Sequence, residues 1–553
     1  MDWREGWGRR LAPYKLEFFF FILAVILYLP GIDWGLPYAT GPDRVYVWAY
    51  DDLSPRAALR EVYQTLAHST AERWLAYPLQ HHFLLVAAYS PYFVWLKLNG
   101  QFLQPSGVYP FGLVDPVSAF RVITLIARLV SVFMAAGCVM IAYLIGSILW
   151  DKKTGILAAT ITLLAYPMFY YTKTANLEVP YLFWTSLGLL VFARILTSGM
   201  SVKRAAWLGV FAGLATATKD QAAGFFILMP VVLAPIYIRD WKAARISKWR
   251  PLLTLLIAGS VTYALGSGLV LDPERYFMHL KWLFGSEGML AQEFVDLYSP
   301  SLRYPSTVFG AFGLTLAVLS ALLKFLGPVI LAVGCYALIQ VALHEPKKLA
   351  FGLPALGYFV FFILPYHWFF LRYAIPLAFV FGVYAARGMV MILGAMERFR
   401  LARVAFIGLA FAWPICLCLY ILFQMQVDAR YAAAEWLAAQ MAQGDSIANC
   451  ANTSALPRLR EDVHILELEG GTAAISQLAE ERPEFVLMMP DWSSTPGMRY
   501  SRYCTDELYQ KLMDGSLGYH LVAEFGVDTP GVSHLLDYPS VNPPVQIFER
   551  EEQ

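Results

Sequence analysis

The sequence predicts a polytopic helical membrane protein with a small α/β domain at its carboxyl end. Of the 553 residues, 58% are hydrophobic and only 15% are charged, whereas a soluble protein carries about a quarter charged residues. Apolar stretches of roughly eighteen or more residues recur along most of the chain, and each is long enough to cross a bilayer as a helix. The last part instead alternates short β-type and helical stretches, which indicates an α/β domain. The net charge of +1 argues against a nucleic-acid partner.

Basic clusters assign a side to each apolar stretch, because cytoplasmic loops are enriched in lysine and arginine. Eleven spans keep every strong cluster inside, provided that segments 82–98 and 306–325 lie at the surface or are re-entrant. If one of these segments crossed the membrane, Lys152–Lys153 or Lys347–Lys348 would lie outside. If both crossed the membrane, Lys203–Arg204 would lie outside. The spans are expected at about 16–36, 120–149, 155–171, 181–196, 205–218, 222–238, 251–271, 327–343, 349–364, 373–396 and 404–425.

This layout predicts a multi-pass protein of the plasma (inner) membrane with a cytoplasmic amino end and an extracytoplasmic carboxyl end. Residues 1–425 form the membrane domain, with outer loops at 37–119, 172–180 and 272–305. Residues 426–553 form the soluble domain outside.

The soluble domain is expected to begin with a helix over Asp428–Met441, which has helical periodicity. Strands are expected at 446–449, 463–468, 485–489 and 519–525, and helices at 472–481 and 505–513. Cys450 and Cys504 stand alone in this domain and could pair outside the cytoplasm. That disulfide would close a loop of about fifty residues and stabilise the domain by a few kcal/mol.

The segment 35–55 follows the first span and is the first candidate for chemistry. It places the carboxylates Asp43, Asp51 and Asp52 among tyrosine and tryptophan residues. Aromatic residues beside a span usually mark the headgroup interface, where acidic residues are costly unless they have a function. Transfer to a hydroxyl or amine requires a carboxylate that accepts the proton of the acceptor.

Charged residues of both signs gather on the same outer face. Glu178, Lys219 and Arg372 flank spans there, and Arg128 lies within the outer third of the second span. A departing lipid phosphate needs fixed cations, and the arginine fork matches phosphate oxygens. Each of these residues also has a purely structural interpretation. Asp51–Asp52 could cap a helix, Lys219 could be a snorkelling side chain, and Arg372 could anchor its helix at the interface. A charge buried in a span, such as Arg128, is functional by default.

Stretches in a fixed order carry a family resemblance. They are GLPYATGPD (Gly35–Asp43), AYPLQHHFLL (Ala76–Leu85), ARLVS (Ala127–Ser131), AYLIGSIL (Ala142–Leu149), YPMFYYTKTANLEVP (Tyr166–Pro180), GLATATKDQA (Gly213–Ala222), RYAIP (Arg372–Pro376) and DARYAAAEWL (Asp428–Leu437). Together the chain resembles the GT-C superfamily of membrane glycosyltransferases, in particular the protein O-mannosyltransferase and aminoarabinose transferase branch. The order and spacing of the stretches carry this resemblance more than any single one does.

The resemblance implies an inverting glycosyltransferase that acts on the outer face of the membrane. Its donor would be a sugar on a polyprenyl phosphate, and its acceptor a hydroxyl, amine or phosphate on a protein, lipid or glycan. Asp43 matches the catalytic aspartate of the first loop, and Glu178 stands in place of the second-loop acid, which is usually Asp. Lys219 matches the loop lysine and Arg372 the RY-x-x-P arginine, and both are expected to bind the donor phosphate together with Arg128.

The chain departs from the family at Asp43–Arg44, where the family commonly reads Asp-Glu. Asp51 and Asp52 are therefore candidate accessory acids. No well-formed Asp-x-Asp motif is present, and neighbouring aspartates on a helix point about 100° apart, so they chelate poorly. Arginine and lysine alone can hold a monophosphate leaving group, and no obligatory metal is expected.

Two other classes of protein stay open at this point. One is a lipid or polysaccharide transporter or flippase, and the other is a catalytically inactive membrane scaffold. Transporters tend to place charges at the bilayer midplane within repeated halves, whereas here the charges gather at one face. This distribution favours the enzyme.

Overall fold

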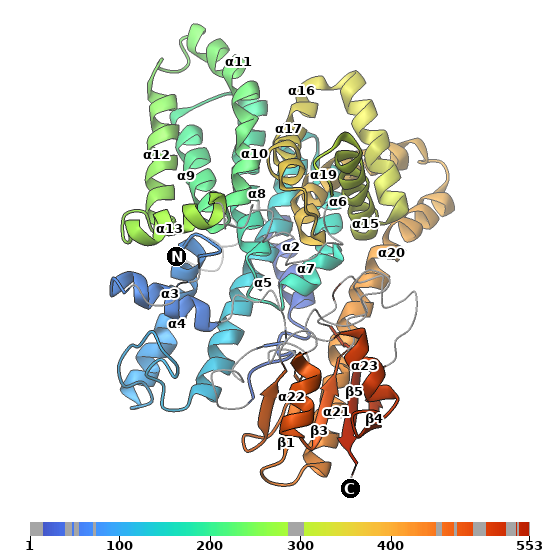
Figure 1. The fold of residues 1–553 in the computed structure, drawn as a ribbon. Coiled ribbons are helices and arrows are strands. Elements are labelled where there is room, and N and C mark those ends of the chain that lie inside the picture. The colour runs from blue at the N-terminus through green and yellow to red at the C-terminus, as the bar shows by residue number, and fades with distance from the viewer. Residues whose placement is uncertain are drawn as a thin grey trace, which may run out of the picture. The chain divides into compact units, whose positions relative to one another are not determined.

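The computed structural model describes residues 15–38, 47–48, 55–69, 73, 75–285, 304–449, 456–468, 473–489, 505–526, 538 and 541–551 (Figure 1). The chain separates into two compact units. The first comprises Met1–Pro30, Arg56–Pro91 and Ala127–Cys418, and the second comprises Gly31–Pro55, Tyr92–Ile126 and Leu419–Gln553.

The first unit is helical throughout its described part. Its helices are α2 (Lys15–Tyr28), α3 (Pro55–Leu66), α6 (Lys152–Leu163), α7 (Tyr166–Tyr171), α8 (Glu178–Ser198), α9 (Val202–Thr218), η2 (Asp220–Ala223), α10 (Gly224–Ile227), α11 (Met229–Lys242), α12 (Arg250–Gly266), α13 (Pro273–Phe284), α15 (Val308–His344), α16 (Pro346–Leu349), η4 (Ala350–Gly352), α17 (Leu353–Tyr358), the π-helical η5 (Phe359–Ile363), α18 (Leu364–Tyr366), η6 (Leu371–Ala374) and α19 (Ile375–Ala395). Three further helices contribute residues to both units, namely α4 (Gln80–Leu98), α5 (Pro116–Leu149) and α20 (Arg400–Gln426).

Six helices in the described part are long and apolar enough to cross a membrane, or seven if the bent pair Asp220–Ile227 and Met229–Lys242 forms one span. This confirms the predicted helical membrane fold, while the count of eleven spans stays a prediction. The third expected span, 155–171, is broken into α6 and α7. Pro167 explains the break, because it has no backbone N–H to donate to the carbonyl oxygen of Leu163, four residues earlier, and its ring would clash with that carbonyl in a continuous helix.

The expected segments 306–325 and 327–343 form one kinked element, α15. The kink lies at Gly327, whose φ of 77° is accessible mainly to glycine, and Pro328 follows it. A Cβ atom on Gly327 would also lie 2.9 Å from the ring of Trp413. Gly327 therefore separates two helical arms of α15, at the boundary that the sequence predicted.

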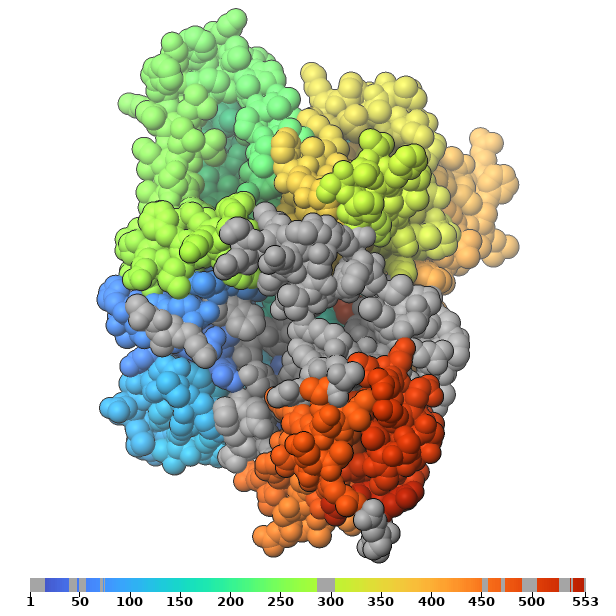
Figure 2. Space-filling view, viewed as in Figure 1, coloured from blue at the N-terminus to red at the C-terminus, as the bar shows by residue number. Residues whose placement is uncertain are grey.

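Close packing of α9 on α12 depends on small residues, as is common between membrane helices. A Cβ atom added to Gly209 would lie 2.4 Å from the carbonyl oxygen of Leu255. The other end of α12 meets α13, where the hydroxyls of Tyr263 and Tyr276 are 3.3 Å apart. The green atoms of these helices form one continuous body in the space-filling view (Figure 2).

The carboxyl-terminal part of the second unit is built around a five-stranded sheet of order β2-β1-β3-β5-β4. Strand β1 pairs in parallel with β2 and β3, and β5 pairs antiparallel with β3 and β4. The elements are α21 (Ala429–Gln440), β1 (Ser446–Asn449), β2 (His464–Glu467), α22 (Ala473–Glu481), β3 (Phe485–Met488), α23 (Asp506–Met513), β4 (Tyr519–Phe525) and β5 (Val545–Arg550). The predicted α/β domain is confirmed, but β5 was missed.

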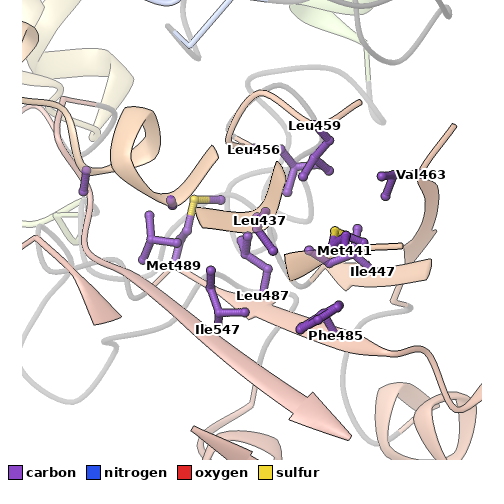
Figure 3. Close-up of a cluster of buried hydrophobic side chains, with 13 residues drawn as sticks. Leu437, Met441, Ile447, Leu456, Leu459, Val463, Phe485, Leu487, Met489 and Ile547 are labelled. Carbon is purple, nitrogen blue, oxygen red and sulfur yellow. The ribbon is translucent and has the colours of Figure 1, made fainter. Parts of the chain in front are cut away.

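Alternating side chains of the strands give the sheet two apolar faces. Leu437 of α21 and Met441, which directly follows this helix, pack with Ile447, Phe485 and Ile547 on one face (Figure 3). On the other face α22 and α23 cover a second cluster formed by Ala448, Val486, Met488 and Phe548 with Leu478, Leu508 and Leu512. Burial on both sides makes this sheet a three-layer core.

A buried ion pair begins this domain. Arg430 donates from Nε and one Nη to the two carboxylate oxygens of Asp428, at 2.8 and 2.6 Å, and neither side chain is exposed. The indole N–H of Trp34 donates to the same carboxylate at 3.0 Å, and Trp48 stacks 4.0 Å from the guanidinium. Trp34 and Trp48, which precede and follow Asp43 in the sequence, thus pack on the start of α21.

Replacing Asp428 by alanine should destabilise this unit by about 3–5 kcal/mol, because it leaves the Arg430 guanidinium buried without its bidentate carboxylate. Asp462→Ala is the matched control. Asp462 pairs with Arg460, also two residues away in the sequence, but these side chains are 36% and 37% exposed. That change should cost less than about 1 kcal/mol. Pulse proteolysis of the full chain in urea measures both, and equal losses would refute the role of the buried pair.

Candidate functional site

Three predicted site residues come from the ends of three helices. Glu178 is the first residue of α8, and its backbone N–H is capped by the side chain of Asn176. Lys219 follows the last residue of α9 in an extended conformation, and Arg372 lies in η6, directly before α19. The positive end of the α8 dipole favours a carboxylate at Glu178.

The structure brings these three side chains together around one carboxylate oxygen. Lys219 Nζ lies 2.6 Å and Arg372 Nε lies 3.2 Å from Oε1 of Glu178. The side chains are 1%, 8% and 15% exposed for Glu178, Lys219 and Arg372, respectively. Oε2 of Glu178 is buried and makes no hydrogen bond among the described residues. The cluster, which we call the ion triad, carries one net positive charge.

Aromatic rings enclose both cations of the ion triad. Lys219 Nζ lies 5.7, 5.4 and 5.8 Å from the ring centroids of Tyr77, Tyr181 and Tyr373. The guanidinium of Arg372 lies 4.6 Å from the ring of Phe370. Such contacts stabilise a cation without neutralising its charge.

Sequence reasoning missed these rings as parts of the site. A signal existed for two of them: Tyr181 lies three residues after Glu178 on α8, which places both on one face, and Tyr373 follows Arg372 directly. Tyr77 lies in AYPLQHHFLL (Ala76–Leu85), one of the stretches that carry the family resemblance. Nothing local in the sequence indicates that its ring lies beside Lys219.

Helix α13 holds the backbone that carries Tyr77. Arg275 donates to the carbonyl oxygen of Tyr77 at 2.9 Å and forms an ion pair with Glu61 at 3.0 Å. His279 contacts the carbonyl oxygen of Leu75 through Nδ1. Burial lowers the pKa of the Arg275 guanidinium, and the adjacent Glu61 opposes that shift. Helix α13, in the loop that was predicted between 272 and 305, therefore positions one ring beside Lys219.

Arg128 lies fully buried in α5 and forms no part of the ion triad in the contacts given by the structure. Its charge acts instead on Lys173, in the loop between α7 and α8. Lys173 donates to the carbonyl oxygen of Tyr28 at 2.9 Å and to the hydroxyl of Thr172 at 3.3 Å. Of the three cations predicted to bind the donor, Lys219 and Arg372 thus lie beside Glu178, whereas Arg128 is buried near Lys173. Their roles in donor binding stay predictions.

Burial, with the charge of Arg128, lowers the pKa of Lys173 to about 7. The unfolded chain then binds a proton that the folded chain releases, so the free energy of unfolding should rise with pH above about 7 and level off near the ordinary lysine pKa. The slope should approach about 1.4 kcal/mol per pH unit. Unfolding at pH 7, 8 and 9 measures it. Lys173→Met should flatten the slope and the exposed Lys281→Met should not; equal slopes in all three proteins would contradict the assignment.

The remaining predicted residues lie outside the described part of the chain. They are Asp43, Arg44, Asp51, Asp52, Cys450 and Cys504. Where the structure does describe the chain, no group of three or more histidine, cysteine, aspartate or glutamate side chains is arranged to hold a metal ion. The absence of an obligatory metal and the disulfide both stay predictions.

Comparison with known proteins supports the resemblance drawn from the sequence. Residues 81–268 match the family model described as dolichyl-phosphate-mannose-protein mannosyltransferase. The matched range contains Arg128, Glu178 and Lys219, whereas Asp43 and Arg372 lie outside it. The match confirms the predicted resemblance to membrane glycosyltransferases. No curated protein matches the chain.

Solved structures of similar overall length align with the chain at low identity. ArnT from Cupriavidus metallidurans, bound to undecaprenyl phosphate, is 12% identical and aligns with a TM-score of 0.46 over 97% of this chain and 98% of that one. The oligosaccharyltransferase of Archaeoglobus fulgidus in the apo form is 12% identical, with a TM-score of 0.48 over 97% and 88% of the two chains. AglB from the same organism, in complex with an inhibitory peptide and a dolichol-phosphate, is 12% identical. It aligns with a TM-score of 0.46 over 98% of this chain and 89% of that one.

Proposed function

We propose that this protein transfers a sugar from a polyprenyl-phosphate donor to a hydroxyl, amine or phosphate of a protein, lipid or glycan on the outer face of the membrane. The observation that carries the proposal is the ion triad. Two cations, Lys219 and Arg372, share one oxygen of Glu178, so that these three side chains together carry one net positive charge. A phosphate is the ligand that such a site suits.

The charge of the ion triad fits the course of the proposed reaction. A polyprenyl-phosphate sugar is a phosphodiester with one negative charge, and breaking its bond to the sugar leaves a monoester that carries a second. The charge on the phosphate therefore grows towards the transition state. Fixed cations that bind the developing charge more strongly than the ground state lower the barrier. In this account Arg372 and Lys219 touch the phosphate, and Glu178 is the residue that positions both.

Loss of the acceptor proton needs a separate base, and we assign it to Asp43. Asp43→Asn preserves size but cannot accept that proton, so turnover should fall by about a hundredfold or more while donor binding hardly changes. Asp51→Asn and Asp52→Asn are the matched controls, expected to be mild if those residues only cap a helix. Full activity in Asp43→Asn with loss in either control would move the base to the second acidic pair.

The proposed activity is tested with purified protein in lipid vesicles and radiolabelled polyprenyl-phosphate sugars. The expected result is release of polyprenyl phosphate that depends on an added acceptor and yields product with the inverted anomer. Movement of intact donor between leaflets without release would favour a flippase. Saturable donor binding without turnover would favour a catalytically inactive scaffold.

A further inference from the structure

A cavity of about 830 Å³ lies where α5 and α8 end and α9 begins. One wall is apolar and is formed by Leu144, Ile148 and Val191 of the two long helices. The rim carries Arg194, Lys203 and Arg204. None of the residues that line the cavity is acidic.

The cations of this rim are available to a ligand. Arg194 and Lys203 are exposed and form no ion pair with the described residues. Arg204 donates from one Nη to the carbonyl oxygens of Ser198 and Gly199, at 2.9 and 2.6 Å, which fixes its guanidinium at the rim without neutralising it.

The nearby carboxylate of Asp240 is already engaged. It accepts a hydrogen bond from the backbone N–H of Met200 at 2.8 Å and forms an ion pair with Arg239 at 2.8 Å. The rim therefore keeps an excess of positive charge.

The cavity lies at the opposite end of α8 from the ion triad. Glu178 begins this helix of 21 residues, and Arg194 and Ser198 lie in its last turns. A helix of that length spans roughly 30 Å, which is the thickness of a bilayer hydrocarbon core. The sequence assigns this end to the cytoplasmic side, and Trp207 beside the rim is 46% exposed, as is typical of residues at a headgroup interface.

We propose that this cavity binds an anionic glycerophospholipid of the cytoplasmic leaflet. Its phosphate would lie among the three rim cations and an acyl chain along the apolar wall. A free anion would use only the cations, and a zwitterionic lipid would meet repulsion between its ammonium group and the rim. Basic pockets between membrane helices on the cytoplasmic side commonly recognise lipid headgroups in this way.

The test uses the purified full chain and measures, by native mass spectrometry, retention of phosphatidylglycerol relative to phosphatidylcholine. The pocket variant combines Arg194→Gln, Lys203→Gln and Arg204→Gln. The matched control combines Lys242→Gln, Arg250→Gln and Arg400→Gln, three exposed charges on the same predicted side. The preference for phosphatidylglycerol should fall roughly tenfold or more in the pocket variant and less than about twofold in the control.

A steric variant separates a lipid from a free anion and serves if the triple variant fails to fold. Ile148→Trp narrows the apolar wall without changing charge, so it should lower phosphatidylglycerol retention several-fold. Excess inorganic phosphate should displace little lipid from the unmodified protein. Equal losses in the two triple variants would reduce the effect to general surface charge and overturn the proposal. Retention unchanged by Ile148→Trp, with displacement by inorganic phosphate, would also overturn it in favour of a free-anion site.

Discussion

Arg372→Ala is expected to weaken donor binding and slow turnover together, each by about ten- to a hundredfold. The reason is that the guanidinium is proposed to bind the donor phosphate both before and during cleavage, and a charge-assisted hydrogen bond contributes about 1.5–3 kcal/mol. Arg372→Lys should recover part of the binding, since it restores the charge but not the planar fork. Donor affinity and single-turnover rates in one lipid preparation measure both effects.

Arg387→Ala is the matched control for this prediction. Arg387 lies on α19, the helix that directly follows Arg372. It also pairs with a glutamate, Glu345 at 3.0 Å, and also lies near an aromatic ring, that of Trp150 at 5.9 Å. It belongs to the other end of α19 and should leave donor affinity unchanged. If both variants lowered donor affinity equally, the effect would be one of membrane-domain stability and the assignment of Arg372 to the phosphate would be wrong.

Glu178→Gln is expected to separate binding from turnover. The change removes the negative charge between Lys219 and Arg372, so the net charge of the ion triad rises and donor affinity should hold or increase. Turnover should nevertheless fall by about a hundredfold, because the two cations lose the carboxylate that positions them for the developing charge. The protein should also lose about 3 kcal/mol of stability, since two buried cations then repel each other.

Glu345→Gln provides the control, because Glu345 likewise lies between two cations, Lys348 and Arg387. A smaller loss of stability, without loss of turnover, is expected there, because Glu345 and its two partners are partly exposed. If Glu178→Gln lowered donor affinity more than turnover, Glu178 would instead contact the donor directly, for example through the sugar hydroxyls.

The fold was largely predictable because its signals are local. Length and apolarity locate α5, α8 and α20. Short strand-like stretches between helical ones locate β1 and β4, whose observed bounds equal the predicted ones. Strand β5 was missed because its sequence, VQIFER, has neither a continuous apolar run nor strict alternation of apolar and polar residues. The broken helices α6 and α7 escaped notice because apolarity continues across Pro167.

The site was predictable only in part, since its geometry depends on contacts far apart in the sequence. The sequence placed Glu178, Lys219 and Arg372 on one face, and the structure adds that two cations share a single carboxylate oxygen. No local pattern reveals that pairing. The support of Tyr77 by Arg275 is also invisible in the sequence, because almost two hundred residues separate them.

The central claim is that the ion triad binds the phosphate of a polyprenyl-phosphate donor. The most direct measurement compares the affinity of the purified protein in lipid for polyprenyl phosphate and for the uncharged polyprenol of equal chain length. The account predicts that the unmodified protein prefers the phosphate by at least about tenfold and that Arg372→Ala loses most of this preference. Equal affinity for both lipids, or a preference that survives in Arg372→Ala and Lys219→Met alike, would contradict it.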